Sequence, residues 1–470
     1  MNFKGITYYL GLFCFPVGIL AFINILYSSY FDYFLSINSY IITLLISVIT
    51  GVALLLFSKE SKKNISFLDQ LVLIVLVYFL IALLISIPLY LSNNQVTFIN
   101  AVFESISGLT GTGFSVFENI KYLDPTLILW RSSSQWIGGL YFLFFLILIF
   151  SNNKFNFKMN NLTFSSDGGI NFEANVKGLL SKIFIIYSSL SLIIFLLLNF
   201  VEIRLFNSLN LSMSMISTGG FLPTNSLNNI IKTNPQKLVF IFALLISILN
   251  FFLILNISQK KVVLRDHKED FYLIIFSIIF IFLIYFNNYS GLDIVISVLS
   301  SLGNSGLSLI NSNNNLSLYF ILLTIIGGSL ISNTSGIKLI RIYILLKTSS
   351  SEILKLISPN SVINKNIFNS ERKITNENIR ISFLIFISFF ISLFILSGIL
   401  IVDKIDFEQS FKLSILTITN TTFSGMFGIE QMNFANLLTT SKLSLIIFMI
   451  IGKIELISVF LIFKKIFYKD

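Results

Sequence analysis

The chain has 470 residues, of which 55% are hydrophobic and 11% are charged, whereas a soluble domain would carry about 25% charged residues. This composition excludes an ordinary soluble fold and favours a membrane protein. The single Cys and the single His exclude a disulfide framework and a His-rich metal site. The formal net charge of +10 needs no nucleic acid to explain it, because a basic cytoplasmic rim accounts for it.

Apolar stretches of about the length that a bilayer core requires recur along the whole chain. In chain order they are residues 6–27, 40–57, 71–91, 130–150, 179–200, 238–257, 271–286, 316–346 (interrupted), 381–402 and 443–463. The pattern predicts an all-α polytopic membrane protein, in which four repeats of helix, pore loop and helix surround a central pore, preceded by two additional transmembrane helices. The expected units are residues 1–66 for those two helices and, for the four pore repeats, residues 67–165, 166–264, 265–372 and 373–470.

A shorter amphipathic segment precedes a polar, Gly-containing loop inside each of the last four pairs of spans, for example at residues 98–109 and 407–420. Such a segment is too short to cross a bilayer, so it predicts a re-entrant pore helix. The loops align without a gap on the glycines Gly113, Gly220, Gly306 and Gly425. Six residues before each glycine stands a hydroxyl residue: Ser107, Ser214, Ser300 and Thr419. A fourfold repeat of this kind is one way for a single polypeptide to build an ion filter.

The four residues that end at each of these glycines include hydroxyls and glycines and carry no charge, which favours coordination of K+ by backbone carbonyls over an acidic ring. Glycine allows positive φ without a Cβ clash, so successive carbonyls can be aimed at one axis. An ordinary Gly/Ser turn would explain one such loop, but four loops in phase favour a filter. The predicted K+ ligand strands are Thr110, Gly111, Thr112 and Gly113; Ser217, Thr218, Gly219 and Gly220; Gly303, Asn304, Ser305 and Gly306; and Thr422, Phe423, Ser424 and Gly425.

Basic clusters set the predicted orientation in the membrane, because cytoplasmic loops carry an excess of Lys and Arg. Such clusters occur at residues 59–63 and 464–469. Placing them inside the cell puts both termini in the cytoplasm and all four Gly loops on the outer side. Asp293 and Asp406 then lie near the starts of pore helices, where the positive end of the helix dipole favours an acid.

The third inner helix is interrupted by small and polar residues. Irregular backbone at membrane depth is tolerated only where it is buried in protein or lines water. The interruption is therefore a candidate gate under the filter, and the alternatives are a simple helix kink or a span that ends at Leu330. The candidate gate residues are Gly327, Gly328, Asn333, Thr334, Ser335 and Gly336.

Lys453 lies near the middle of the last span, where a charge is costly and usually faces a cavity or a partner. A cation facing the pore would oppose K+ below the filter, which makes Lys453 a candidate pore barrier. The alternatives are a snorkelling lysine or one paired across a subunit interface. Arg131 lies at the outer end of its helix, where a structural anchor is favoured over a pore role.

Three segments now give the chain a specific resemblance. WRSSSQWIGG (residues 130–139) is similar to the first inner-helix signature of the TrkH/KtrB superfamily of bacterial potassium transporters. GGSLISNTSGIK (residues 327–338) is similar to the Gly-rich third inner helix of that superfamily, and GKIE (residues 452–455) resembles its last-helix motif, where Arg more often replaces Lys453. The two extra spans before the first repeat resemble the TrkH branch.

The resemblance implies channel-like potassium uptake across the bacterial inner membrane. It also implies a homodimer and a gating cytoplasmic nucleotide-binding subunit of the TrkA/KtrA type. The sequence contains no Walker-type P-loop and no dinucleotide fingerprint, so nucleotide would bind to that other chain. Two alternatives stay open: the potassium-binding subunit of an ATP-driven pump, and a K+ symporter coupled to Na+ or H+. A membrane-embedded enzyme such as a transferase is disfavoured, because the chain has one His and few intramembrane acids.

Overall fold

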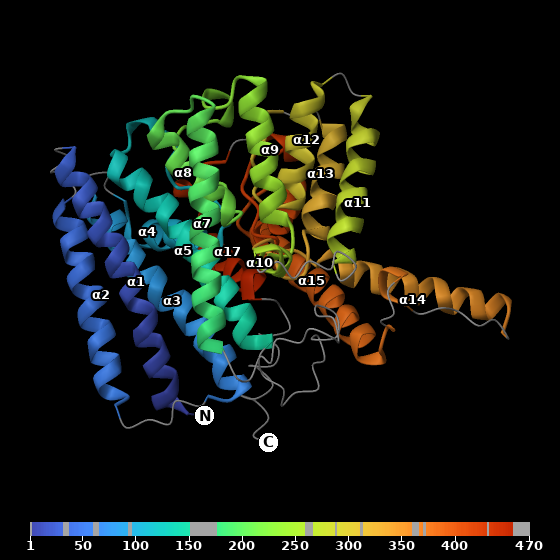
Figure 1. Cartoon of the computed structure of the whole chain (residues 1–470), viewed down its shortest axis with the longest axis horizontal. Coiled ribbons are helices and arrows are strands. Elements are labelled where there is room, and N and C mark those ends of the chain that lie inside the picture. Colours follow the sequence, from blue (N-terminus) through green and yellow to red (C-terminus); the bar gives the residue numbers. More distant parts are fainter. Residues whose placement is uncertain are drawn as a thin grey trace.

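The computed structural model describes residues 2–31, 37–59, 65–92, 96–150, 176–258, 267–286, 289–310, 314–359, 366–369, 373–429 and 432–454. Within these ranges the chain is helical, and its only β pairing is an isolated bridge between Asn366 and Lys373. Most long helices run roughly side by side, whereas α14 (Leu339–Ile357) projects to one side of the molecule (Figure 1). The all-α fold predicted from the sequence is confirmed.

Five described helices are long and apolar enough to cross a membrane. They are α1 (Phe3–Tyr30), α2 (Ile37–Phe57), α3 (Phe67–Leu91), α7 (Val176–Phe200) and α15 (Asn376–Val402). Three further helices occupy other predicted spans: α5 (Pro125–Phe150), α11 (Lys268–Tyr285) and α17 (Thr439–Ile454). The rest of the last predicted span, beyond residue 454, lies outside the described residues.

The predicted span at residues 238–257 is not one straight helix. It consists of α9 (Asn234–Ile248) and α10 (Phe251–Ser258), which meet at an angle of 102°. Backbone groups freed at the break find partners inside the protein. The N–H of Asn250 donates to Oδ1 of Asp270 at 2.9 Å, and the N–H of Phe251 donates to the carbonyl of Ile331 at 2.7 Å. Such a bend is tolerated at membrane depth because these groups are satisfied without water.

Among the described residues, four short helices each lie between the two spans of a predicted pair. They are α4 (Phe98–Thr110), α8 (Leu205–Ile216), α12 (Gly291–Leu302) and α16 (Phe407–Ile418). None is long enough to cross a bilayer, and each is followed by a polar loop, as the sequence predicts. Two of the starts carry acids: Oδ2 of Asp406 accepts the N–H of Glu408 at 3.2 Å, and Asp293 lies in the first turn of α12. An acid at a helix N-terminus satisfies free N–H groups and complements the dipole.

Each short helix also packs against a helix that belongs to a different predicted repeat. α8 contacts α5, α12 contacts α9, α16 contacts α13 (Asn314–Ile326), and α4 contacts α17. The contact between α4 and α17 joins the first predicted repeat to the last one. There, Nζ of Lys442 on α17 donates to Oδ1 of Asn100 on α4 at 2.7 Å. The four contacts therefore form a closed cycle, and the polar loops lie inside it.

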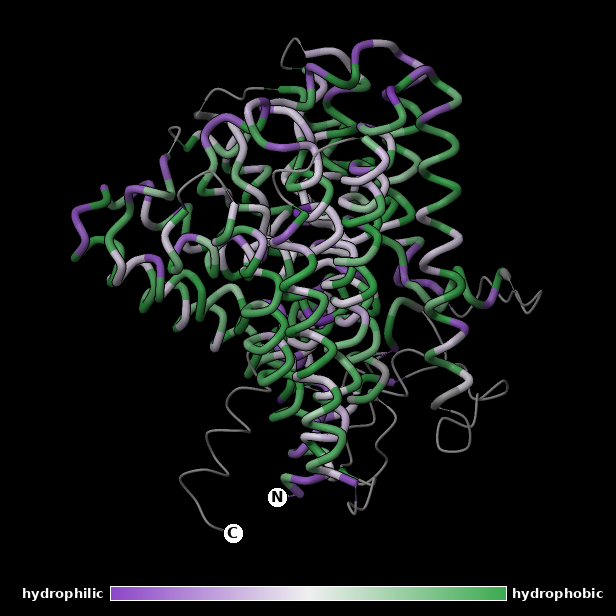
Figure 2. Tube along the Cα trace, turned by 90° about the vertical axis from the view of Figure 1, so that its left-hand side faces the viewer, coloured by the Kyte–Doolittle hydropathy of each residue, from purple (hydrophilic) through white to green (hydrophobic). Residues whose placement is uncertain are grey.

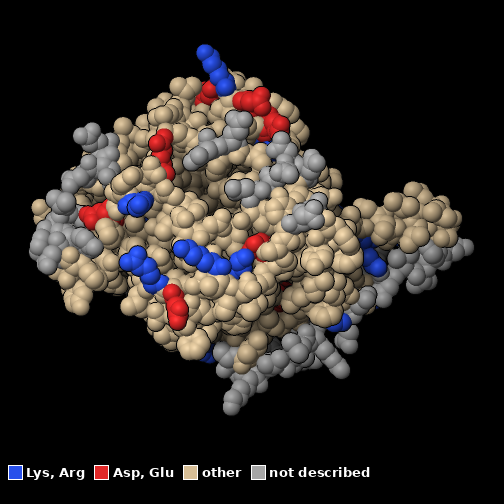
Figure 3. Space-filling view, turned by 90° about the horizontal axis from the view of Figure 1, so that it is seen from above, with Lys and Arg blue, Asp and Glu red and all other residues tan. Residues whose placement is uncertain are grey.

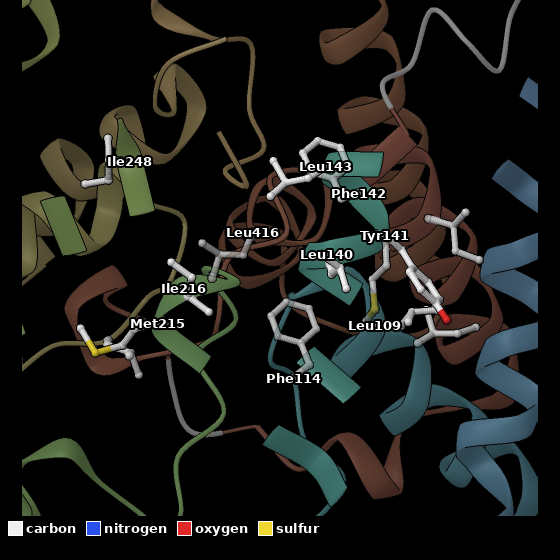
Figure 4. Packing of buried hydrophobic residues seen from close by; sticks show 14 of the residues in the cluster. Leu109, Phe114, Leu140, Tyr141, Phe142, Leu143, Met215, Ile216, Ile248 and Leu416 are labelled. Carbon is white, nitrogen blue, oxygen red and sulfur yellow. The ribbon is translucent and has the colours of Figure 1, made fainter. Parts of the chain in front are cut away.

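The periphery and the interior of the molecule differ in chemistry. Hydrophobic residues cover most of the trace, and many hydrophilic ones gather at helix ends (Figure 2). α1 and α2 pack on each other beside α3, and their outer faces expose large apolar side chains such as Leu45 and Ile49. Exposed apolar faces suit hydrocarbon, where no polar group could be satisfied. Inside, Leu109, Phe114, Ile216 and Leu416 belong to one apolar cluster with residues 140–143 of α5 (Figure 4).

We expect Gly138→Ala to destabilise the fold. A Cβ at this position would lie 2.0 Å from the carbonyl oxygen of Leu109, a backbone atom at the end of α4 that cannot move aside. Overpacking of this kind costs about 1–3 kcal/mol. Thermal unfolding in detergent measures the loss. Gly398→Ala is the matched control, because a Cβ there meets nothing within 4 Å. Equal stability of the two variants would contradict the close packing of α5 on α4.

Candidate functional site

The loops after the four short helices begin with one shared backbone feature. We name them loop 1 (residues 111–119), loop 2 (217–226), loop 3 (303–310) and loop 4 (419–429). Each holds a residue with positive φ whose N–H donates to the carbonyl three residues earlier. These residues are Gly111 (φ 76°), Thr218 (56°), Asn304 (56°) and Asn420 (48°). Positive φ is costly for a residue with a side chain, so it persists only where surrounding bonds fix it.

Those bonds are present around both asparagines. Nδ2 of Asn304 donates to the carbonyl of Thr324 at 2.9 Å and to Oγ1 of Thr421 at 3.1 Å. Nδ2 of Asn420 donates to Oγ1 of Thr112 at 2.9 Å and to the carbonyl of Met449 at 2.8 Å. Loop 3 is therefore tied to loop 4, and loop 4 to loop 1.

Three of the four predicted glycines lie in this ring of loops. Gly113, Gly220 and Gly306 are buried and have positive φ of 74°, 100° and 64°. Their neighbours are too close for any side chain. A Cβ on Gly113 would lie 2.9 Å from the carbonyl oxygen of Gly219, and one on Gly220 would lie 2.4 Å from that of Ser305. The backbone of loop 2 therefore contacts the backbones of loops 1 and 3 directly.

The fourth predicted glycine is placed differently. Gly425 is exposed and begins the 3₁₀ helix η7 (Gly425–Phe427). The residue beside the other three glycines is Thr422: a Cβ on Gly306 would lie 2.2 Å from the carbonyl oxygen of Thr422. The ring of Phe423 meets Phe434 edge-on at 5.9 Å, and Ser424 is half-buried. The register of loop 4 in space therefore differs by three residues from the gap-free alignment.

The hydroxyls that recur in the short helices hold the first three loops. Oγ of Ser107 donates to the carbonyl of Phe114 at 2.7 Å, and Oγ of Ser214 accepts the N–H of Gly220 at 2.9 Å. Oγ of Ser300 lies 2.9 Å from Oγ of Ser305. Each bond satisfies a buried polar group of a loop from its own helix, as buried polar groups require. Thr110, at the end of α4, pairs its hydroxyl with Thr112 at 2.8 Å.

Helix α5 supports loops 1 and 2 through a buried ion pair. Nε of Arg131 lies 2.7 Å from Oε1 of Glu104 on α4, and both side chains are 1% exposed. Glu104 also accepts the N–H of Val116 at 2.8 Å, and the guanidinium of Arg131 stacks 4.1 Å from the ring centre of Phe221. Arg131 is thus an anchor, as expected. Sequence reasoning missed Glu104, whose signal was an acid in the middle of a short apolar helix.

Two further residues of the same helix fix the second loop. Oε1 of Gln135 accepts the N–H of Phe221 at 3.1 Å. Gly139 lets α5 approach loop 2 closely, since a Cβ there would lie 2.9 Å from the Cβ of Ser217. The WRSSSQWIGG segment therefore holds loops 1 and 2 in position.

The interruption of the third inner helix forms a compact segment below the loops. We call residues 327–338 the break segment. It returns to the end of α13, because the N–H groups of Ile337 and Lys338 donate to the carbonyls of Ile325 and Ile326, both at 2.9 Å. Gly327 and Gly336 have positive φ of 70° and 84°, which the tight return requires. The segment is therefore an ordered loop and not a simple kink.

One side of the break segment faces loops 2 and 4 and is bonded to them. Nδ2 of Asn333 donates to the carbonyl of Ile216 at 2.8 Å, and its own carbonyl accepts the hydroxyl of Thr218 at 3.2 Å. Oγ of Ser335 donates to Oδ1 of Asn420 at 3.0 Å. These bonds place Asn333 and Ser335 directly against the ends of the short helices.

The rest of the break segment is held by its own Lys338 and by Glu269 of α11. Nζ of Lys338 donates to Oγ1 of Thr334 at 2.8 Å, and Thr334 accepts the N–H of Gly328 at 3.1 Å. The N–H of Leu330 donates to Oε1 of Glu269 at 3.0 Å. Glu269 lies in the first turn of α11, so the break segment is tied to the first helix of the third predicted repeat.

Lys453 is buried beside the break segment. Its Nζ donates to the carbonyl of Asn333 at 2.8 Å and lies 4.6 Å from the ring centre of Phe142. It is also close to loop 1, since a Cβ on Gly111 would lie 3.8 Å from this nitrogen. The structure therefore places Lys453 in the interior of the protein, next to the break segment and loop 1. This position does not fit a snorkelling lysine. Glu455 lies outside the described residues.

These features define an all-α polytopic membrane protein in which four short helices end at one buried polar site. Comparison with known proteins identifies the family. The model of the TrkH family, described as a cation transport protein, matches residues 36–287 and 311–470. The chain therefore belongs to the TrkH family, within the TrkH/KtrB superfamily, and the resemblance read from its motifs is confirmed.

Individual relatives cover most of the chain. An uncharacterized cation transporter of Methanocaldococcus jannaschii is 26% identical and covers 100% of this chain and 97% of its own length. The Trk system potassium uptake protein TrkG of Escherichia coli is 24% identical, with 88% of each chain covered. The crystal structure of the potassium transporter TrkH from Vibrio parahaemolyticus superposes with a TM-score of 0.87 over 100% of both chains at 19% identity. The relatives are transporters and not enzymes, in agreement with the sequence prediction.

We expect Glu104→Ala to destabilise the protein by about 3–5 kcal/mol, because it leaves the buried guanidinium of Arg131 without its counter-charge. Thermal unfolding in detergent measures the effect. Glu352→Ala is the matched control: it breaks an ion pair with Lys355 of 3.0 Å that is largely exposed, which costs about 1 kcal/mol or less. The anchor role is refuted if the two variants lose the same stability.

Proposed function

We propose that this chain mediates potassium uptake across the cytoplasmic membrane by a channel-like mechanism, with loops 1 to 4 as its selectivity filter. The observation that carries the proposal is the convergence of four loops, rich in glycine and hydroxyl residues, on one buried site inside a closed cycle of helices. The names of the relatives from Escherichia coli, Trk system potassium uptake proteins, favour K+ as the transported ion.

The proposed ligands are backbone carbonyls at and just before Gly113, Gly220 and Gly306, completed by loop 4. Positive φ at these glycines turns the carbonyls of successive residues, which lets several oxygens face one cation. The short helices add to this, because the negative ends of their dipoles are directed at the loops. No fixed carboxylate is needed to stabilise the cation.

We further propose that the break segment is the gate. It lies directly under loops 2 and 4, bonded to Thr218 and Asn420. A cation leaving the filter must pass it. The Lys453 ammonium beside Asn333 adds electrostatic repulsion at the same level. The gate would open by loss of the few hydrogen bonds that hold the segment to the loops.

The assembly and the orientation complete the proposal. The family resemblance suggests a homodimer and a cytoplasmic regulatory subunit of the TrkA/KtrA type that drives the gate. Basic clusters in the sequence favour cytoplasmic termini and an inner-membrane location. The opposite face, where α9 and α12 begin, carries both charge signs (Figure 3), including a pair of Lys237 and Asp293 at 2.6 Å.

Flux measurements in proteoliposomes test the mechanism. With a fixed membrane potential, K+ uptake that is independent of Na+ and pH supports a channel-like protein. Uptake that follows a Na+ or H+ gradient would instead support cation-coupled symport, and a requirement for ATP and a P-type ATPase subunit would support the pump alternative.

We expect Gly113→Ser and Gly306→Ser each to reduce K+ uptake or to admit Na+. A side chain at either position meets backbone or side-chain atoms of loop 4 within about 2 Å, so the carbonyls cannot keep their direction. The measurement is K+ and Na+ flux in proteoliposomes containing equal amounts of folded protein. Gly398→Ser serves as the control, because its site is open. Unchanged K+ over Na+ preference in both loop variants would rule out the filter.

We expect Lys453→Gln to raise K+ flux without changing the preference for K+ over Na+, and Lys453→Arg to keep flux low. Removing the charge lowers the barrier below the filter, and a tenfold rise corresponds to about 1.4 kcal/mol. The same liposome assay measures both variants. Lys442→Gln is the matched control, since Lys442 is a buried lysine at the other end of α17. If Lys453→Gln folds normally and its flux does not rise, Lys453 is not a barrier.

A further inference from the structure

The four loops can be aligned by their backbone instead of by their glycines. In each loop the residue with positive φ follows the short helix, and its N–H donates to the carbonyl three residues earlier. Counting two residues onward from Gly111, Thr218 and Asn304 reaches Gly113, Gly220 and Gly306. Counting two onward from Asn420 reaches Thr422. The ring that carries glycine in three loops therefore carries threonine in the fourth.

The side chain of Thr422 occupies the middle of this ring. Its Oγ1 donates to the carbonyl of Gly219 at 2.7 Å. The same oxygen is the atom that a Cβ on Gly113 or on Gly220 would meet first, at 2.0 and 1.9 Å. One hydroxyl thus lies against loops 1 and 2 together, while the Thr422 carbonyl lies against Gly306 of loop 3.

The order of the helices shows that this bond crosses the ring. α8 packs on α5, α12 on α9, α16 on α13 and α4 on α17, so loop 4 adjoins loops 3 and 1 and stands opposite loop 2. A bond from Thr422 to Gly219 therefore spans the centre between opposite loops. It also occupies one of the carbonyls that the proposed filter would offer to a cation.

We infer that Thr422 is the specificity-determining residue of the pore, with a hydroxyl that bridges opposite filter loops and must turn aside for each passing cation. This inference rests on the proposed function. The other three positions offer only backbone, so Thr422 is the one place where a side chain sets the width and the ligands of the ring. Its β-branched side chain has few χ1 rotamers, which makes the turn a discrete step.

The size of the Thr422 side chain and the ligands that it leaves to the cation determine whether K+ or Na+ is favoured. An inward side chain narrows a carbonyl ring, and its hydroxyl withdraws the bonded carbonyl of Gly219 from the cation. The narrower ring penalises the larger K+ more than Na+. Removing the side chain frees the carbonyl of Gly219 and widens the ring. K+ should gain more than Na+ from that change.

The test compares Thr422→Gly, Thr422→Val and the unmodified full-length protein in proteoliposomes at a fixed potential, with K+ and Na+ as separate permeant ions. Thr422→Gly should raise K+ flux about fivefold, the factor for one net hydrogen bond of about 1 kcal/mol, and should raise the K+ to Na+ flux ratio. Thr422→Val keeps the shape but places a methyl group on the axis, so flux of both ions should fall. Gly398→Ala should transport like the unmodified protein, because Gly398 lies in α15, outside the four loops, and a Cβ there meets nothing within 4 Å.

Two outcomes overturn the inference. One is a Thr422→Gly protein with unaltered K+ flux and K+ to Na+ ratio. The other, which remains decisive if Thr422→Gly fails to fold, is a Thr422→Val protein that transports like the unmodified one. Gly306→Ser separates this failure from failure of the proposed function. If Gly306→Ser impairs K+ transport and the Thr422 variants change nothing, the filter stands and only the role of Thr422 is lost. If Gly306→Ser and Gly113→Ser also change nothing, the filter itself is lost.

Discussion

The structure depends on one constraint, which is that every backbone polar group at membrane depth must find a partner inside the protein. Four loops of irregular backbone begin in the interior, and their buried parts are bonded to their own short helix or to a neighbour. Ser107 and Ser214 bond to loops 1 and 2, Gln135 bonds to the N–H of Phe221, and Glu104 accepts the N–H of Val116. The closed cycle of helix contacts follows from the same need, because an unclosed set would leave one loop exposed to lipid.

The sequence predicts the elements whose signal is local. Hydropathy locates the long helices, and half-length segments locate α4, α8, α12 and α16, because segment length relative to the bilayer separates the two kinds. Gly113, Gly220 and Gly306 are found for a similar reason, since each must tolerate positive φ and a contact that no Cβ allows. The bend between α9 and α10 has no such signal, as it depends on bonds from Asn250 and Phe251 to residues far along the chain.

Loop 4 shows why a repeat pattern can be misread. Gly425 matches the other glycines in sequence, and Thr419 matches the hydroxyl six residues before them. In the structure, the residue of loop 4 that corresponds to Gly111, Thr218 and Asn304 is Asn420. It takes positive φ because its amide is bonded to Thr112 and Met449. Asparagine tolerates this conformation better than most residues, so it can replace a glycine there. A pattern of side-chain types cannot reveal this register, because tertiary hydrogen bonds decide it.

Loops 1, 2 and 4 share one hydrogen-bond network with the break segment, which gives the proposed gate a physical route to the proposed filter. Asn420 bonds to Thr112 of loop 1 on one side and accepts Ser335 of the break segment on the other. The carbonyl of Asn333 accepts both Thr218 of loop 2 and Lys453 of α17. Movement of the break segment must therefore break bonds that also fix positive φ at Thr218 and Asn420. Because strained backbone persists only while its surroundings hold it, opening the gate would relax loops 2 and 4, which are the two loops that Thr422 bridges.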